Sequence, residues 1–142
     1  NVIPSSNALF AEALYKLGKL SGEQKYLDIA YDAVRQVYQI ATEEAVFYDY
    51  FHWLKLAMLM GNPGLEVVVM GDHFKNDLLE LNHGFQPDIV FAGSGTPSTL
   101  PLLSDKFVKN QNTIYVCRDH VCRLPVNTPQ AAVKLIAEER VN

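Results

Sequence analysis

The hydrophobic pattern divides the chain into a helical first part and an alternating second part. Over the first sixty residues, apolar side chains recur every three or four positions, which is the spacing of amphipathic helices. Ser5 or Ser6 can cap a first helix, Ser21 and Gly22 end it, and a second helix follows. Because the connection is short, we expect the two helices to be antiparallel neighbours. The buried face expected for the second helix consists of Tyr26, Leu27, Ala30, Ala33, Val34, Val37 and Tyr38.

A third helix is predicted over residues 44–60, and it is apolar on much of its surface. Such breadth indicates a helix that is covered on more than one side. The sequence Gly-Asn-Pro-Gly at residues 61–64 stops this helix and forms a turn. We therefore place a boundary there, between a helical segment (residues 1–61) and a second subdomain (residues 65–142).

The second part contains three short apolar runs rich in β-branched residues, at 66–71, 88–93 and 113–117. Each is typical of a strand buried on both faces, as in a parallel sheet. A helix is predicted from about residue 76 to 83 and another from residue 128. Strands that alternate with helices indicate right-handed crossovers. We therefore predict an α/β fold: N-terminal helices followed by a small three-stranded, mostly parallel α/β subdomain.

The last helix has the clearest start signal in the chain. Thr128 is a favourable N-cap residue and Pro129 suits the first helical position. Its expected buried residues are Ala132, Val133, Leu135 and Ile136. Gly84 is similarly well placed to end the helix before it.

Charge and composition exclude some classes of function. The net charge of −4 and the pI near 5.5 do not fit a nucleic-acid-binding domain, which would carry clustered Lys and Arg. Charged residues interrupt every apolar stretch well before the roughly 18 residues that a membrane span needs. No signal peptide is visible, which favours a cytoplasmic location, although two cysteines leave the redox compartment open. No cofactor motif is complete, since the Gly93-Ser94-Gly95-Thr96 loop matches neither nucleotide-binding pattern and is best interpreted as a plain connection.

Cys117 and Cys122 are the only cysteines in the chain. If residues 113–117 and 122–126 form a hairpin with a four-residue loop, the two cysteines lie directly opposite each other, within disulfide range. Three interpretations stay open: two thiols that simply pack in the fold, a structural disulfide, or a redox pair whose thiols are activated by Arg118 and His120. A zinc or iron–sulfur site needs four ligands, and only His120 joins the pair locally.

Asp49 and His52 lie three residues apart on the predicted third helix, beside Trp53. A carboxylate, an imidazole and an indole on one helix face could line a sugar pocket. The alternative, which we favour, is a helix surface beside a core tryptophan.

Several of these stretches together resemble one family. They are Pro4-Ser5-Ser6-Asn7-Ala8, the hairpin with Leu17-Gly18 and Leu20-Ser21-Gly22, the strand Val67-Val68-Val69-Met70-Gly71, and above all Tyr115-Val116-Cys117 with Cys122 and Pro125-Val126. The family is the thioredoxin-domain-containing family that includes spermatogenesis-associated protein 20. Its members resemble a thioredoxin-like domain joined to a six-hairpin α/α toroid related to N-acylglucosamine and cellobiose epimerases.

The resemblance implies that this chain is the C-terminal region of a longer protein. Residues 1–61 would then be the closing hairpins of the toroid, with the remainder of the full-length chain as partner. The function implied is a structural or interaction role with no complete active site. An exposed apolar face on the helices would also favour a homo-oligomer. Two alternatives are a carbohydrate-acting epimerase or hydrolase, in which Asn7, Asp49 and His52 touch the sugar, and a redox partner segment that uses Cys117 and Cys122.

Overall fold

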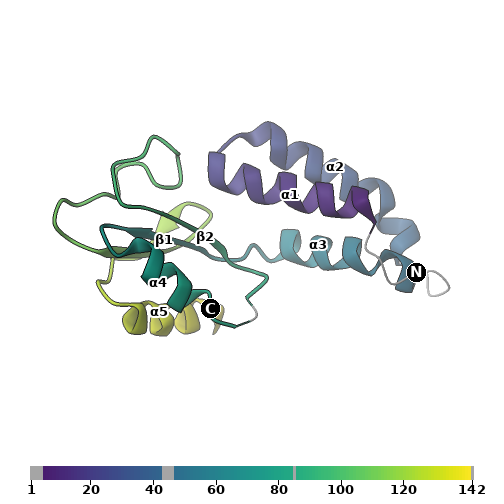
Figure 1. Ribbon diagram of the computed structural model, residues 1–142. Coiled ribbons are helices and arrows are strands. Elements are labelled where there is room, and N and C mark those ends of the chain that lie inside the picture. Colours follow the sequence, from purple (N-terminus) through teal and green to yellow (C-terminus); the bar gives the residue numbers. More distant parts are fainter. Residues whose placement is uncertain (1–4, 43–46, 85, 142) are drawn as a thin grey trace. The chain divides into compact units, whose positions relative to one another are not determined.

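The computed structural model describes residues 5–42, 47–84 and 86–141, and the chain divides into two compact units, Asn1–Pro63 and Gly64–Asn142. The first unit is helical (Figure 1). Its elements are α1 (Ser6–Ser21), α2 (Gln24–Ala41), the 3-10 helix η1 (Phe47–Tyr50) and α3 (Phe51–Gly61). The predicted third helix is thus α3 preceded by η1, and the expected residues 44–46 lie outside the described residues.

Helices α1 and α2 form the predicted antiparallel hairpin (Figure 1). Gly22 ends α1 in the left-handed conformation, with φ of 69°, and its N–H donates to the carbonyl oxygen of Gly18 at 2.9 Å. Gly18 also lets the helices approach closely, because a Cβ there would lie 2.6 Å from Cδ2 of Leu27. Two glycines therefore set both the sharpness of the turn and the closeness of the two helices.

Fewer side chains are buried in the core of the helical unit than the hydrophobic pattern predicts. Ala30 and Val34 of α2 are buried as expected, but Tyr38 is 50 % exposed, which corrects the expected buried face. On α3, Trp53 and Leu56 are buried, whereas Met58 is 75 % exposed. The buried residues of this core are Ala8, Ala11, Tyr15, Ala30, Val34, Trp53, Leu56 and Met60. One side of α3 is thus covered within the unit and another side lies open.

The second unit has the predicted α/β class. Its elements are β1 (Glu66–Met70), α4 (Phe74–Leu81), β2 (Val90–Ser94), β3 (Thr113–Arg118), β4 (Val121–Cys122) and α5 (Pro129–Val141). The four strands form one sheet in the order β2-β1-β3-β4. The sheet therefore has one strand more than the three that were expected.

The strand directions differ from the mostly parallel sheet that was predicted. Only β1 and β2 are parallel, whereas β3 is antiparallel to β1 and β4 is antiparallel to β3. A parallel return needs a crossover, usually a helix, and residues 95–112 between β2 and β3 contain none. The chain therefore enters β3 at the edge where β2 ended and runs back the other way.

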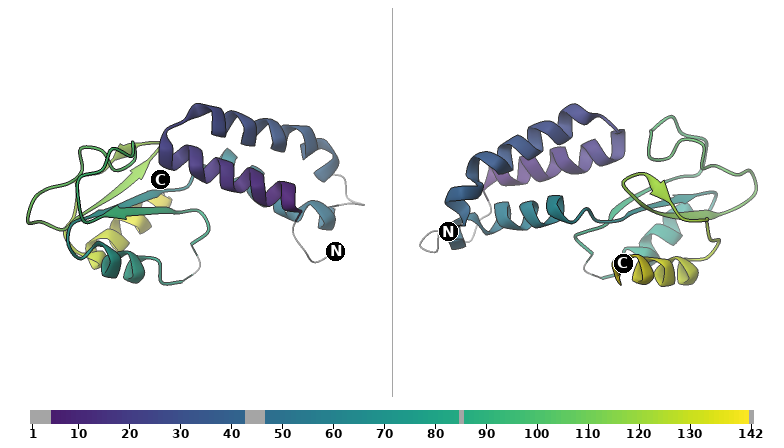
Figure 2. Two further views of the ribbon diagram at one scale, coloured as in Figure 1. Left: turned by 45° about the horizontal axis from the view of Figure 1, so that its top comes forward. Right: turned by 180° about the vertical axis from the view of Figure 1, so that it is seen from behind.

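Helices α4 and α5 cover the same face of this sheet (Figures 1 and 2). Alternate residues of the strands point to that face and make the core. Its buried residues are Leu65, Val67, Val69, Leu81, Ile89, Ile114, Val116, Ala132 and Ile136. Thr128 caps α5 as predicted, since its Oγ1 accepts the N–H of Ala131 at 3.3 Å, but Val133 is 54 % exposed rather than buried.

Candidate functional site

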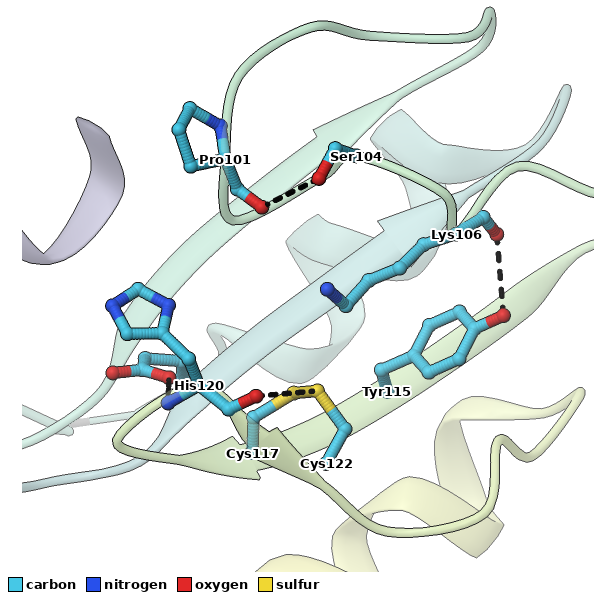
Figure 3. The surroundings of a disulfide bond; sticks show 8 residues. Pro101, Ser104, Lys106, Tyr115, Cys117, His120 and Cys122 are labelled. Carbon is cyan, nitrogen blue, oxygen red and sulfur yellow. Dashed lines mark hydrogen bonds between the residues drawn. A yellow bond between two sulfur atoms is a disulfide. The ribbon is translucent and has the colours of Figure 1, made fainter. Parts of the chain in front are cut away.

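The two cysteines lie opposite each other on β3 and β4 and are bridged by a disulfide (Figure 3). Their Cα atoms are 3.9 Å apart. Directly opposed strand residues without mutual backbone hydrogen bonds bring their side chains closest together, which suits a cross-strand bridge. A loop this short contributes about 2 kcal/mol on the chain-entropy account of disulfides.

The turn that joins these strands is tighter than expected. The strands continue through the pair Arg118↔Val121, so the loop has two residues, Asp119 and His120, instead of four. Both residues have positive φ, 48° and 64°. Two successive residues with positive φ are characteristic of a type I′ turn, whose backbone twist matches the right-handed twist of the two flanking strands. Beyond Cys122 the strand pairing is interrupted: β4 ends at Cys122 rather than at residue 126, and Val126 pairs again with Ile114 as an isolated bridge.

Glu66 is the residue at this site that sequence reasoning missed. It is fully buried at the start of β1, and it pairs in register with Cys117. Its Oε2 accepts the backbone N–H of His120 at 2.9 Å, which anchors the turn to the central strand β1. Glu66, Cys117 and Cys122 therefore form one row across three adjacent strands. The available signal was a carboxylate directly before an unbroken apolar strand.

The two arginines around the hairpin are bound to α5. Arg123 Nε pairs with Glu139 Oε1 at 2.5 Å, and Arg118 Nη2 donates to the carbonyl oxygen of Glu139 at 2.5 Å. These contacts fix both strands of the hairpin to the helix. Arg118 could lower the pKa of a cysteine thiol, as predicted, only if its guanidinium gave up this hydrogen bond to Glu139.

The two cysteines differ in their access to solvent. Cys117 is 1 % exposed, whereas Cys122 is partly exposed. β4 is the edge strand of the sheet, and the apolar side chains beside Cys122 project into solvent, Val121 at 76 % and Leu124 at 88 % exposure. One end of the disulfide is therefore inside the sheet and the other end lies at its rim.

In the helical unit, a buried carboxylate gathers three basic side chains. Glu12 of α1 is 8 % exposed. Its Oε2 lies 2.7 Å from His52 Nε2 and 2.6 Å from Lys55 Nζ, and its Oε1 lies 2.8 Å from Lys16 Nζ. Burial alone raises the pKa of Glu12, but the hydrogen bonds from Lys16 and Lys55 outweigh it and lower that pKa to about 2. The ionised carboxylate thus ties α1 to α3.

This cluster changes the interpretation of the predicted sugar site. His52 faces Glu12, so its Nε2–H is used by that carboxylate. Asp49 lies in η1 and Asn7 on α1, and both are exposed. Across the described ranges, no hydrogen bond joins Asn7 or Asp49 to His52. A sugar-binding role for Asn7, Asp49 and His52 stays a prediction, and Glu12, 40 residues from His52, is the neighbour that no local spacing reveals.

An apolar groove runs between α2 and α3. It contains two adjoining hollows of about 380 and 310 Å³, which share Tyr38 and Ala57. The larger hollow is lined by Tyr38, Phe51, Leu54, Lys55, Ala57 and Met58. Among the described residues, Lys55 is the one charged side chain of the larger hollow, and Arg35 and Gln39 are the polar side chains of the smaller one. Apolar and aromatic side chains make up most of both linings, so the groove suits a mainly apolar occupant.

Other candidate features carry less chemistry. Ser94 at the end of β2 forms hydrogen bonds with the backbone of Thr96, so the Gly93–Thr96 loop is occupied by its own contacts. Within the described ranges, no group of three or more His, Cys, Asp or Glu side chains could hold a metal ion. In that same part of the chain, none of the helices combines the length and apolar character needed to cross a membrane.

Comparison of the chain with models of protein families, with curated proteins and with solved structures found no match. The resemblance to the thioredoxin-domain-containing family therefore stays a prediction from the residues that carry it.

Proposed function

We propose that the helical unit is an interaction module, the closing hairpins of an α/α toroid, which docks against further helical hairpins of a longer chain. The observation that carries the proposal is the apolar groove between α2 and α3. We propose a structural or interaction role for this unit, without a complete active site of its own. We also propose that the chain is cytoplasmic.

The exposure of α2 and α3 supports an apolar occupant. Met58 is 75 % exposed and Tyr38 is 50 % exposed, and both line the groove. Phe51 of α3, at 62 % exposure, lines the same hollow. Soluble monomers rarely leave large contiguous apolar patches open, and such patches usually mark interaction sites.

The chemistry of the groove favours a helix over a sugar. Sugars require several converging polar groups, whereas the larger hollow offers one charged side chain, Lys55, and that lysine already pairs with Glu12. An amphipathic helix placed in an apolar groove uses side chains three and four positions apart as anchors. The pattern of α3, which predicts coverage on more than one side, agrees with such an occupant.

The test compares this chain with a longer one that carries the preceding hairpins. Backbone hydrogen exchange of α2 and α3 should slow in the longer chain, because an added hairpin would cover the groove. Met58→Glu should abolish that slowing, and Leu79→Glu, at a 74 % exposed position on α4, is the matched control. Equal exchange of α2 and α3 in both chains would contradict the proposal.

Self-association gives a second measurement. Without its hairpin partner, the 142-residue chain should associate through the same groove at high concentration, and sedimentation should show the association weakened by Met58→Glu. If Met58→Glu associates as strongly as the unmodified chain, self-association uses a surface other than the groove.

A further inference from the structure

We propose that the Cys117–Cys122 disulfide is a thiol–disulfide exchange site, reduced at Cys122 by a protein dithiol. This inference does not depend on the docking proposal, because it rests only on the α/β unit.

The position of the bond selects which sulfur is attacked. Exchange is an in-line displacement, so the attacking thiolate must approach a sulfur from the side opposite its bonded partner. Cys117 lies on β3, with β1 on one side and β4 on the other, and it is 1 % exposed. Cys122 lies on the edge strand β4 and is partly exposed. The geometry therefore directs attack to Sγ of Cys122.

The balanced reaction has two displacements. A thiolate of the dithiol forms a bond to Cys122 Sγ, the Cys117–Cys122 bond breaks, and its electron pair leaves on Cys117 Sγ, which takes a proton from solvent. The second thiolate of the dithiol then attacks the partner's own sulfur in the mixed disulfide. Cys122 Sγ leaves with the electron pair and takes a second proton. The partner ends as a disulfide and the hairpin has gained two electrons and two protons.

The hairpin has contacts that would hold the reduced pair together. The N–H of Arg123 donates to the carbonyl oxygen of Val116 at 3.0 Å, and the N–H of His120 donates to Glu66. Cys122 Sγ lies 3.8 Å from the carbonyl oxygen of His120 (Figure 3). A bridged sulfur has no hydrogen to donate, so this contact becomes a hydrogen bond only after reduction. The thiols would thus stay adjacent, and the exchange would be reversible.

The edge strand also offers a way to bind the dithiol protein. Val121 of the edge strand β4 and Leu124 just beyond its end are exposed apolar side chains on either side of Cys122. An extended edge segment can add to a partner by strand-like backbone pairing, with alternate side chains giving specificity. The partner inferred is therefore a protein whose reactive cysteine lies beside an apolar surface.

The sequence allows a direct test on the unmodified chain. Trypsin cleaves after Lys109, Arg118 and Arg123, so Cys117 and Cys122 fall in different peptides. The folded protein is treated with reduced glutathione, quenched in acid, alkylated and digested. Because access decides which sulfur is attacked, we expect glutathione on the peptide of residues 119–123 at least about tenfold more often than on residues 110–118. Equal labelling, labelling mainly on residues 110–118, or no reduction short of unfolding would overturn the inference.

A matched pair of variants extends the test to a protein dithiol. Cys117→Ser leaves Cys122 as the single thiol, and Cys122→Ser leaves Cys117. Oxidised glutathione first converts the single thiol of each variant into a mixed disulfide with glutathione, and one glutathione thiol is released. The remaining thiolate of a dithiol protein that lacks its second cysteine should then displace glutathione from Cys122 Sγ in Cys117→Ser and form a disulfide-bonded adduct, and it should not do so with Cys122→Ser. Circular dichroism checks that both variants are folded, and the peptide experiment on the unmodified chain stands if either variant is not. Adducts of similar yield on the two variants would contradict the assignment of Cys122.

Discussion

Each unit of this chain buries one carboxylate, but the two carboxylates have different surroundings. In the α/β unit, Glu66 is fully buried among the covered strands and accepts the backbone N–H of His120. In the helical unit, Glu12 has three basic partners, and an apolar groove lies open beside the core. Both units thus have a core, but the groove on the helical unit is the surface where we propose that further helices dock.

The largest expected effect tests whether the α/β unit folds around its own core. Val116 is fully buried on β3, so Val116→Asp places a charge among apolar side chains and should cost at least about 4 kcal/mol. Hydrogen exchange should show the sheet unfolded while α1 and α2 keep their protection. Val133→Asp, on the exposed side of α5, should change stability by less than about 0.5 kcal/mol. If α1 and α2 lose protection together with the sheet, the two units are one cooperative structure.

A smaller effect concerns the buried charge of the helical unit. The pKa of Glu12 is about 2 in the folded protein and 4.5 ordinarily, so its ionised form stabilises the fold. That stabilisation is complete above the ordinary pKa and is lost as the pH falls through about 2. Its upper limit is about 3 kcal/mol. Urea unfolding of the helical unit should therefore become easier as the pH falls from about 5 toward 2.

Glu12→Gln should remove this pH dependence and lower the stability at neutral pH. Glu23→Gln is the control, since Glu23 is an exposed residue of the same unit. A variant Glu12→Gln whose unfolding keeps the pH slope of the unmodified chain would assign that slope to other carboxylates.

The smallest effect concerns the disulfide. Replacing both Cys117 and Cys122 by Ala should lower the free energy of unfolding of the α/β unit by about 2 kcal/mol, the contribution of so short a closed loop. The helical unit should be unaffected. Calorimetry of the unmodified chain, with and without a reductant, provides the comparison. A loss well above this value would show that the bridge also holds the native contacts of Glu66 and Glu139.

The parts of this fold that could be predicted are those determined by near neighbours. The β-branched run at Glu66–Met70 gives β1, and Thr128 with Pro129 gives the start of α5. The direction of β3 could not be read from its own residues, because it depends on the path of residues 95–112. A helix-free connection of that length was the available sign, and it favours an antiparallel return.

In the candidate sites too, features set by near neighbours in the sequence could be predicted, and features set by distant residues could not. The opposition of Cys117 and Cys122 follows from a hairpin, which is local. The tighter turn was not predictable from residue type, because Asp119 and His120 both adopt the left-handed conformation without a glycine. The Glu12–His52 pair joins residues 40 positions apart, and only the packing of α1 on α3 brings them together.

Because the turn has only two residues, the disulfide depends on the number of residues between Cys117 and Cys122 as well as on the presence of both cysteines. Successive residues of a strand point to opposite faces, so one residue inserted between Arg118 and Val121 would turn Cys122 away from Cys117. The same insertion would move Arg123 away from Glu139 and His120 away from Glu66. Substitutions at Asp119 and His120 that keep a positive φ preserve this alignment, whereas an insertion does not. The sequence separation of 5 between the two cysteines therefore has to be kept for the disulfide to form.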